Sequence, residues 1–385
     1  MIHICFITNE FPKSGFPHGG IGSFVKTLGN YLVQQGIRVT VIGINYTSDY
    51  EESEVEGMHI YRLKKVKVNG LTWWLNQSAI GKKILEIHRQ HPIDVVETSE
   101  LGLAFIHKIK KVKYVVRLHG GHHFFSEAEN RTPGFWKGFQ EKRSFARADA
   151  FVAVSNYVKS HTEKYLSYHG KNVALISSPV NTDLFKPISA KIVSESIAFV
   201  GTVCEKKGVR QLIQAFVIVK KSNPNASLKI YGRDWHYPDG SSYIEMLREK
   251  VLSLLGSMAS DVHFMGNISH AALPMQYANA SVCVFPSHME TQGLVAPEAM
   301  LMEKVVIFTE LGLGPEAIID GETGLLCNPY SPEDIAEKIN WVFNNKEKAD
   351  RIAKQARIAA LNKYGPNKII KSNILFYEKL IGYGG

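Results

Sequence analysis

The sequence predicts an α/β protein with two doubly wound domains, because strand and helix patterns alternate along the chain. Its 385 residues are too many for one ordinary hydrophobic core. A hydrophobic content of 45% and a charged content of 21% are typical of globular proteins. The segment 179–187, rich in turn-forming residues, separates two series of alternating elements. We therefore expect one parallel sheet in each half.

The first half predicts a domain over residues 1–182. Apolar runs predict strands near 2–8, 38–44, 58–63, 93–97, 113–118, 150–154 and 173–176. Helices are expected near 21–35, 78–90, 100–109, 135–147 and 156–166. The first helix shows the clearest period, since Ile21, Phe24, Val25 and Leu28 fall on one face.

The second half predicts a domain over residues 183–365, followed by a helical tail over 366–385. Its expected strands lie near 196–201, 227–232, 262–266, 282–285 and 305–308. Pro366 is a natural point for the tail helix to begin.

Composition excludes several classes of protein. No run approaches the roughly eighteen apolar residues that a membrane span needs. The first residues read as a strand without a basic leader, so no signal peptide is expected. The four cysteines show no pair at metal-binding or redox spacing, which suits a reducing cytoplasm.

The chain is basic, with a formal net charge of +9. Much of the excess lies in the lysine-rich segments 64–67, 82–83 and 108–113, with Trp73 and Trp74 between the first two. We favour an ordinary solvated face here. Peripheral contact with an anionic membrane is the alternative, and nucleic acid ranks third because no nucleic-acid module is recognisable.

Two carboxylates, Glu290 and Glu298, bracket a Gly293-Leu294 turn directly after the apolar run 282–285. That run predicts a buried parallel strand, so Glu290 falls in a loop where open α/β sheets bind ligands. Glu298 falls at the start of the next helix, where the helix dipole and free amides favour anions. The arrangement predicts a ligand held at two points, such as a sugar nucleotide.

With these four residues at this spacing, the chain resembles the retaining glycosyltransferases of family 4. Their fold is GT-B, two Rossmann-like doubly wound domains facing a central cleft. The resemblance implies that Glu298 binds the ribose hydroxyls of the donor and that Glu290 lies beside the donor sugar. It also implies an acceptor-binding first domain, a donor-binding second domain and a C-terminal helix that packs back on the first domain.

A glycine-rich loop follows the first expected strand and precedes the first helix. Gly19, Gly20 and Gly22 let backbone approach a ligand closely, and the helix start offers amides to an anion. The spacing is not a dinucleotide fingerprint, because no Gly or Ala lies three residues after Gly22. The resemblance implies that Gly20 and Gly22 face the donor and Gly19 the acceptor.

Three histidines, His119, His122 and His123, follow the strand 113–118. The resemblance implies that His119 touches the donor sugar, while His122 and His123 remain acceptor-side candidates. Such a cluster also resembles a metal site, but no nearby carboxylate or cysteine completes one. Because the family needs no metal in its active site, we expect none.

The loop 199–208 resembles the diphosphate-binding loop of the family. Gly201 matches its glycine, and Lys207 matches the lysine that neutralises the donor diphosphate. Thr202 stands where arginine is usual, which removes one bidentate donor. Arg210 or Lys206 would then supply the missing charge.

Further matches extend the resemblance over about residues 12–330 in order. Gly232 ends an expected strand where the family has a glycine beside the nucleotide. The segments 312–316 and 320–326 match the family's Gly-x-Pro-Glu and Thr-Gly-Leu-Leu runs.

The resemblance implies metal-independent, retaining transfer of a hexose-type sugar from a UDP- or GDP-sugar, without a cofactor. The acceptor would be a hydroxyl of a glycan or lipid-linked glycan in cell-surface polysaccharide biosynthesis. Such an enzyme would work in the cytoplasm, at the inner face of the cell membrane. Glu290, His119 and Lys207 are the catalytic candidates.

Other functions fit the same architecture. A sugar phosphorylase would use phosphate to release sugar from a glycan, and a nucleotide-sugar epimerase would need no acceptor. A non-catalytic sugar-binding protein is the alternative from another class. A dehydrogenase is disfavoured by the missing dinucleotide fingerprint.

Overall fold

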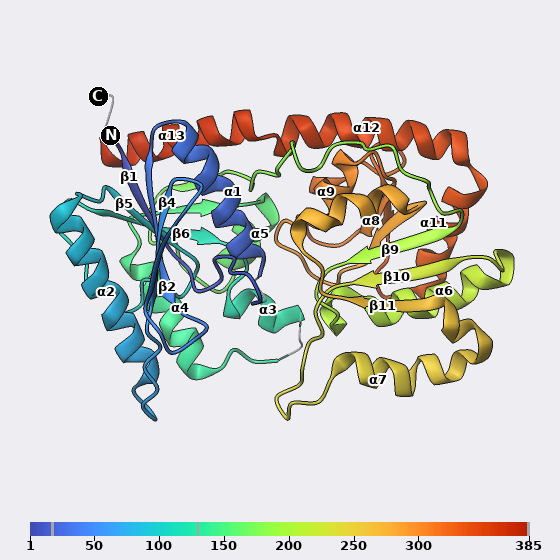
Figure 1. The fold of residues 1–385 in the computed structure, drawn as a ribbon, viewed down its shortest axis with the longest axis horizontal. Helices are drawn as coiled ribbons and strands as arrows, with labels where there is room; N and C mark the ends of the chain where they lie inside the picture. Colours follow the sequence, from blue (N-terminus) through green and yellow to red (C-terminus); the bar gives the residue numbers. More distant parts are fainter. Residues whose placement is uncertain (17–18, 129–130, 383–385) are drawn as a thin grey trace. The chain divides into compact units, whose positions relative to one another are not determined.

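The computed structural model describes residues 1–16, 19–128 and 131–382, which form two compact units (Figure 1). The first unit comprises Met1–Pro179 and Pro366–Gly385, and the second comprises Val180–Gly365. The observed boundary lies close to the one expected at 182/183. The tail joins the first unit, and residues 383–385 of the expected tail lie outside the described part.

The sheet of the first unit has the strand order β3-β4-β2-β1-β5-β6-β7-β8. Its strands are β1 His3–Ile7, β2 Arg38–Ile44, β3 Glu51–Val55, β4 Met58–Leu63, β5 Val95–Thr98, β6 Lys113–Leu118, β7 Ala150–Ala153 and β8 Val173–Leu175. The β3–β4 pair is antiparallel, and the other neighbours pair in parallel. Strand order reverses between β1 and β5, which is where open sheets of this kind bind ligands.

Helices cover both faces of this sheet (Figure 1). They are α1 Gly20–Gln34, α2 Thr72–Gln90, α3 His122–Ala128, α4 Phe135–Arg147, α5 Asn156–Glu163 and α13 Pro366–Ile381. The predicted apolar face of α1 is confirmed, since Phe24, Val25 and Leu28 are buried in the core. Helix α13 packs beside α1 and adds Phe376 to the same core.

The helix predicted over 100–109 is wrong, because that segment forms turns and irregular structure. Its backbone carbonyls accept hydrogen bonds from arginines of α4. Arg143 Nε donates to the carbonyl of Ala104 at 2.6 Å, and Arg147 Nε to that of Leu103 at 3.1 Å. These bonds replace the internal bonds that a helix would have made. The short elements β3 and α3 are additions that the sequence pattern does not predict.

The second unit contains a wholly parallel sheet with the order β11-β10-β9-β12-β13-β14. Its strands are β9 Ser196–Val200, β10 Ser227–Tyr231, β11 Val262–Gly266, β12 Val282–Phe285, β13 Val306–Thr309 and β14 Leu325–Cys327. The strands predicted for this half are confirmed, and β14 is an addition. Strand order reverses between β9 and β12.

The helices of the second unit pack on both faces of its sheet (Figure 1). They are α6 Val209–Ser222, α7 Tyr243–Lys250, α8 Leu273–Asn279, α9 Val295–Leu301, α10 Gly314–Ala317, α11 Pro332–Asn344 and α12 Lys346–Tyr364, with the 3-10 segments η1 Glu205–Lys207, η2 Leu252–Asp261 and η3 His270–Ala272. Across the described part of the chain, no helix is long and apolar enough to cross a bilayer. All four cysteines are buried free thiols.

A buried ionic cluster ties α13 to the first sheet. The Arg117 guanidinium donates to both Glu97 oxygens at 2.6 and 3.2 Å and to Asn373 Oδ1 at 2.7 Å. The Tyr377 hydroxyl donates to Glu97 Oε2 at 2.8 Å. Arg117 and Glu97 are each 1% exposed. A buried charge is tolerated only when it is paired, so the position of α13 depends on this cluster.

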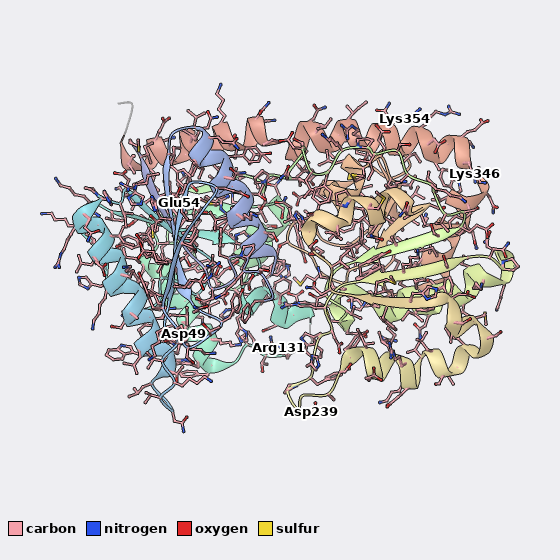
Figure 2. The ribbon with its side chains drawn as sticks, viewed as in Figure 1. Asp49, Glu54, Arg131, Asp239, Lys346 and Lys354 are labelled. Atoms are coloured by element: carbon pink, nitrogen blue, oxygen red, sulfur yellow. The ribbon has the colours of Figure 1, made fainter. Side chains whose placement is uncertain are left out.

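We predict that Glu97→Gln lowers the free energy of unfolding by about 3–5 kcal/mol, because it leaves the buried Arg117 charge uncompensated. Tyr377→Phe removes the hydrogen bond to Glu97 and a longer one from Arg117, but it leaves both charges paired and is expected to cost only about 1–2 kcal/mol. Urea unfolding of both variants measures the difference. Glu54→Gln, at an exposed carboxylate labelled in Figure 2, is the control and should not change stability. Equal losses in Glu97→Gln and Glu54→Gln would contradict the assignment.

Candidate functional site

In the second unit, the loops after β9 and β12 meet at the point where strand order reverses. Lys207 Nζ, at the end of η1, forms an ion pair with Glu290 Oε1. The Ser287 hydroxyl donates to the same oxygen at 3.1 Å. The two loops are also joined directly, since the His288 N–H donates to the carbonyl of Lys206 at 2.9 Å. The sequence places Lys207 and Glu290 in the same site but does not predict that they pair.

Backbone lies directly against backbone where β9 and β10 end. Gly232 has φ +154°, and a Cβ at this position would lie 1.7 Å from the carbonyl oxygen of Gly201. Any side chain here would push the two loops apart, so glycine is required. The predicted site residues Gly201 and Gly232 therefore lie in contact, next to Thr202.

Gly293 and Leu294 form the turn that separates Glu290 from α9. Gly293 takes φ +62°, a left-handed conformation that suits glycine, and Leu294 immediately precedes the helix. Glu298 then falls in the first turn of α9. The predicted strand, loop and helix start around the two carboxylates are confirmed.

Glu298 is held in one orientation by two partners that the sequence gives no sign of. The Tyr277 hydroxyl donates to Glu298 Oε2 at 3.2 Å, and His270 Nε2 lies 2.9 Å from Oε1. Burial and the Glu298 charge raise the pKa of Tyr277 well above its usual value, so the phenol stays a donor. Glu298 itself is 5% exposed. These partners lie on η3 and α8, whose sequences carry no recognisable motif.

Arg210, one expected substitute for the arginine missing at Thr202, is already paired. Its guanidinium lies 2.6 Å from Glu205 Oε1, and the Tyr243 hydroxyl donates to Glu205 Oε2 at 2.6 Å. Burial opposes ionisation of Glu205, but the hydrogen bonds from Arg210 and Tyr243 lower its pKa to about 2. The charge of Arg210 is therefore matched by Glu205.

A different cation lies beside Thr202. Arg233, which follows β10, is exposed, and its Nε lies 3.5 Å from Thr202 Oγ1, at the outer limit of a hydrogen bond. Among the described residues, no ion pair involves Arg233. The sequence could have suggested it, since Arg233 directly follows the matched Gly232.

In the first unit, the glycine-rich loop packs against Glu10. A Cβ at Gly19 would lie 2.2 Å from Glu10 Oε2, and one at Gly22 would lie 1.8 Å from the carbonyl oxygen of Glu10. At Gly20 nothing lies within 4 Å. The close approach to Glu10 thus explains Gly19 and Gly22, and Gly20 alone faces open space. Residues 17–18 of this predicted loop lie outside the described part.

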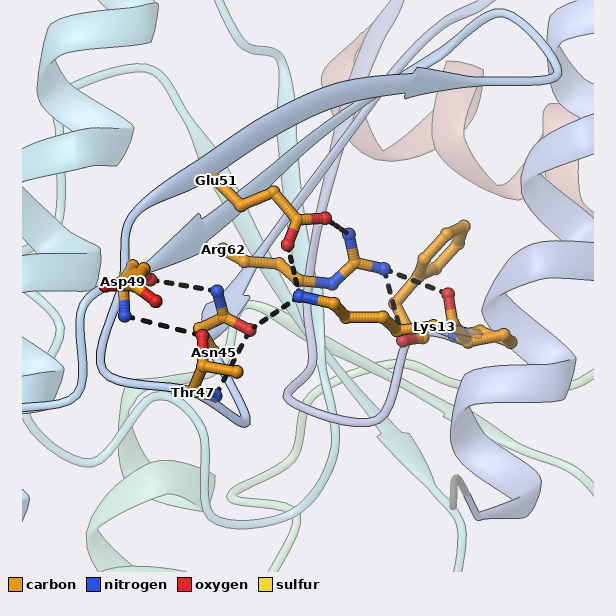
Figure 3. Close-up of polar contacts among 8 residues, drawn as sticks. Lys13, Asn45, Thr47, Asp49, Glu51 and Arg62 are labelled. Carbon is orange, nitrogen blue, oxygen red and sulfur yellow. Dashed lines mark hydrogen bonds and ion pairs between the residues drawn. The ribbon is translucent and has the colours of Figure 1, made fainter. Parts of the chain in front are cut away.

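The start of this loop is anchored to the β3–β4 hairpin (Figure 3). Arg62, 6% exposed, donates to Glu51 Oε1 at 2.9 Å and to the carbonyl of Pro12 at 2.9 Å. Lys13 pairs with the same Glu51 carboxylate and contacts Asn45 Oδ1 at 3.5 Å. The unpredicted strand β3 therefore supplies the carboxylate that fixes the loop.

His119 lies just beyond β6, with its ring 4.9 Å from that of Phe24. Burial, followed by the nearby Arg117 charge, lowers the pKa of His119 to about 3. The imidazole is therefore neutral at physiological pH, so it acts as a hydrogen-bonding group and not as a cation.

Two buried carboxyl groups lie beneath the histidine loop. Glu100 Oε1 accepts the N–H of His119 at 2.6 Å, and Glu141 accepts those of His122 and His123 at 2.7 and 3.0 Å. Glu141 also pairs with His123 Nδ1. Burial and the Glu141 charge raise the pKa of Glu100 to about 8. The sequence does not predict this pair, because Glu141 lies within an ordinary amphipathic helix.

The histidines thus have structural partners of their own. In addition to its backbone bond, His122 accepts the N–H of Gly134 through Nε2 at 2.8 Å. Within the described ranges, no group of three or more His, Cys, Asp or Glu side chains is arranged to hold a metal ion.

We predict that the free energy of unfolding of Glu100→Gln increases relative to that of wild type as the pH rises from about 5 to 8. Folded Glu100 keeps its proton up to about pH 8, whereas an unfolded Glu loses it near 4.3. Wild-type stability should therefore fall across this window, because the folded state binds the extra proton. Melting temperatures measured across this pH range test the effect. Parallel curves for the two proteins would contradict it.

Two family models match the chain, each over a different part. The model described as Glycosyltransferase Family 4 matches residues 18–184, and the model described as Glycosyl transferases group 1 matches residues 184–359. The boundary between the matches lies close to the boundary between the two units.

Two relatives illustrate the range of similarity. An uncharacterized glycosyltransferase of Methanocaldococcus jannaschii is 26% identical over 349 residues, covering 87% of this chain and 88% of the relative. The capsular polysaccharide biosynthesis glycosyltransferase CapM of Staphylococcus aureus is 28% identical over 170 residues, covering 44% and 42%.

Solved structures agree on the fold. A sucrose-phosphate synthase from Thermosynechococcus elongatus has a TM-score of 0.86 at 20% identity, with 99% of this chain and 100% of that chain covered. Anabaena HepE in complex with UDP and glucose has a TM-score of 0.76 at 17% identity, with the same coverage. On these matches and on its two parallel-sheet units, the chain belongs to glycosyltransferase family 4 and has the GT-B fold.

Proposed function

We propose that this protein is a retaining glycosyltransferase that moves a hexose-type sugar from a UDP- or GDP-sugar to a hydroxyl of a glycan or lipid-linked glycan. The observation that carries the proposal is the meeting of Lys207 and Glu290 at the reversal point of the second sheet, in the loop before α9, whose first turn carries the oriented Glu298. Relatives support this class of reaction, since one is named for capsular polysaccharide biosynthesis and another was solved with UDP and glucose.

In this proposal the second unit holds the donor. Glu298, fixed by Tyr277 and His270, accepts hydrogen bonds from the ribose hydroxyls. The diphosphate takes Lys207 away from Glu290, and Glu290 then turns to the hydroxyls of the donor sugar. Before the donor binds, the ion pair keeps both charges compensated, and the ligand then replaces each partner.

The chemistry follows from these charges. The bond between the anomeric carbon and the diphosphate oxygen breaks, and the acceptor oxygen bonds to the same face of the sugar. The acceptor proton passes to an oxygen of the leaving diphosphate. Lys207 stabilises the negative charge that develops there, so we propose that the reaction needs neither metal nor cofactor.

The proposed role of His119 follows from its protonation state. A neutral imidazole can donate a hydrogen bond to a sugar hydroxyl or accept one from it, and it carries no charge of its own. We assign His119 to the donor sugar, Gly20 and Gly22 to the donor as well, and Gly19, His122 and His123 to the acceptor side.

We further propose that Arg233 replaces the arginine that the family has at position 202. Its guanidinium lies beside Thr202 and has no carboxylate partner among the described residues, so it is available to a phosphate. Gly232, directly before it, brings the backbone of β10 against the same loop.

The cytoplasm is the proposed location, at the inner face of the membrane, in a pathway that builds cell-surface polysaccharide. Four buried free thiols suit a reducing compartment. We propose that the protein's contact with the membrane is peripheral.

Mass spectrometry of the protein with a panel of UDP-, GDP- and ADP-sugars, with and without glycan acceptors, tests the proposal. Free nucleoside diphosphate from one donor is expected, and Glu290→Gln should lower its rate at least about 100-fold. Glu347→Gln, at an exposed carboxylate of α12, should retain full rate. An isomeric nucleotide sugar would indicate an epimerase, and sugar phosphate formed from glycan a phosphorylase. Full activity of Glu290→Gln would refute its role.

We predict that Arg233→Met raises the KM for the donor by about tenfold, as expected for one lost charge-assisted hydrogen bond. Adding Thr202→Arg to that variant should restore the KM, since it puts the cation back beside the same loop. Arg248→Met, on the exposed face of α7, is the matched control. Steady-state kinetics measure all three, and an unchanged KM in Arg233→Met would exclude Arg233 from the donor site.

A further inference from the structure

The first unit exposes a cluster of large apolar side chains around the starts of α2 and α4. We call it the aromatic–basic face. Its apolar members are Val68 (42% exposed), Leu71 (53%), Trp74 (53%), Phe135 (89%), Trp136 (52%) and Phe139 (43%). The same two segments carry exposed lysines, namely Lys64, Lys65, Lys67, Lys137 and Lys142. Exposed apolar patches of this kind commonly mark contact surfaces.

The rings of this face are packed into a preformed array. Trp136 stacks on Phe139 with ring centroids 5.8 Å apart and meets the edge of Trp73 at 6.0 Å. Trp73 in turn packs against Phe105 at 4.5 Å. Arg143 lies over Phe105 at 5.1 Å. The loop before α2 is held by hydrogen bonds as well.

The loop is fixed through side chains at the start of α2. The Val66 N–H donates to Asn76 Oδ1 at 2.9 Å, and the Val68 N–H to Thr72 Oγ1 at 2.8 Å. These bonds hold the lysine-rich segment 64–67 beside the exposed rings.

Within the two segments that form the face, the exposed charges have one sign. Residues 64–76 contain no acid, and residues 131–143 contain only Glu141, which is fully buried beneath the histidine loop. Arg131, labelled in Figure 2, begins the second of these segments. A one-signed surface of this kind attracts an anionic partner over about one Debye length.

We propose that the aromatic–basic face docks on an anionic lipid bilayer. Tryptophan rings suit the boundary between lipid headgroups and acyl chains, and lysines beside them bind anionic headgroups. Aromatic rings alone would also suit a free glycan. The neighbouring lysines favour lipid, because a neutral glycan carries no negative charge for them to bind.

The face adjoins the proposed acceptor side of the site. Gly134, directly before Phe135, donates its N–H to His122 Nε2 at 2.8 Å. The next turn of α4 lies against His123, since a Cβ at Gly138 would be 3.2 Å from that ring. Docking through α4 would therefore bring a lipid-linked acceptor next to His122 and His123, a consequence that rests on the proposed function.

Co-sedimentation of the full-length protein with vesicles tests the docking. We expect binding to phosphatidylcholine vesicles that contain about 30% phosphatidylglycerol and little binding to pure phosphatidylcholine. NaCl at about 0.5 M should weaken binding, because it shortens the Debye length to roughly 4 Å. Equal affinity for both vesicles, or none for either, would overturn the proposal.

Two sets of variants locate the surface. Phe135→Ser with Trp136→Ser, and Lys64→Glu with Lys65→Glu and Lys67→Glu, should each weaken binding at least about tenfold. Leu254→Ser, at a residue 82% exposed, and Lys346→Glu with Lys354→Glu, labelled in Figure 2, are matched changes in the second unit and should bind like wild type. Wild-type binding by the first two variants would refute this surface.

Donor turnover in vesicle-free solution separates the two proposals. Vesicle binding without consumption of any nucleotide sugar would leave the docking surface standing and contradict the proposed function. Turnover without vesicle binding would support the proposed function and contradict the docking surface. A dimer in solution that Phe135→Ser with Trp136→Ser abolishes, without vesicle binding by wild type, would assign the face to a second copy of the chain and overturn the lipid proposal.

Discussion

The structure depends on the requirement that parallel strands return to the same edge of a sheet. Every loop that follows a strand then meets its neighbours there, and a gap opens where strand order reverses. In the second unit this brings together Lys207 and Glu290, which are 83 positions apart in sequence. In the first unit it brings the glycine-rich loop after β1 close to the segments that follow β5 and β6. The candidate site residues are products of this geometry.

Burying charge has a cost, and the protein meets it in different ways. Arg117 and Glu97 compensate each other permanently, in a cluster closed by Asn373 and Tyr377. Glu100 avoids the cost by keeping its proton up to about pH 8. Lys207 and Glu290 also pair, but at the carboxyl ends of the strands, where a ligand can replace either partner. That difference separates the charged residues with a structural role from those that we propose bind the donor sugar nucleotide.

Most of the fold was predictable, because buried strands and amphipathic helices carry strong periodic signals. The failures share a cause: contacts distant in sequence override local pattern. Residues 100–109 are not helical because arginines of α4 bind their carbonyls. Likewise, Glu141 has no local signature, and its role depends on the histidine loop of another segment. The site residues could be predicted from the spacing of motifs in the sequence. Partners such as Tyr277 and Arg233 could be found only from the three-dimensional structure.

The central claim is that the loops at the carboxyl ends of the second sheet's strands bind a nucleoside diphosphate through Lys207. Calorimetric titration of the protein with UDP, GDP and ADP tests it most directly, because it requires no acceptor. We expect one of the three to bind, and Lys207→Met to lose most of that affinity while Lys221→Met, at an exposed lysine of α6, keeps it. Equal binding by wild type and Lys207→Met, or no binding of any nucleotide by wild type, would contradict the account.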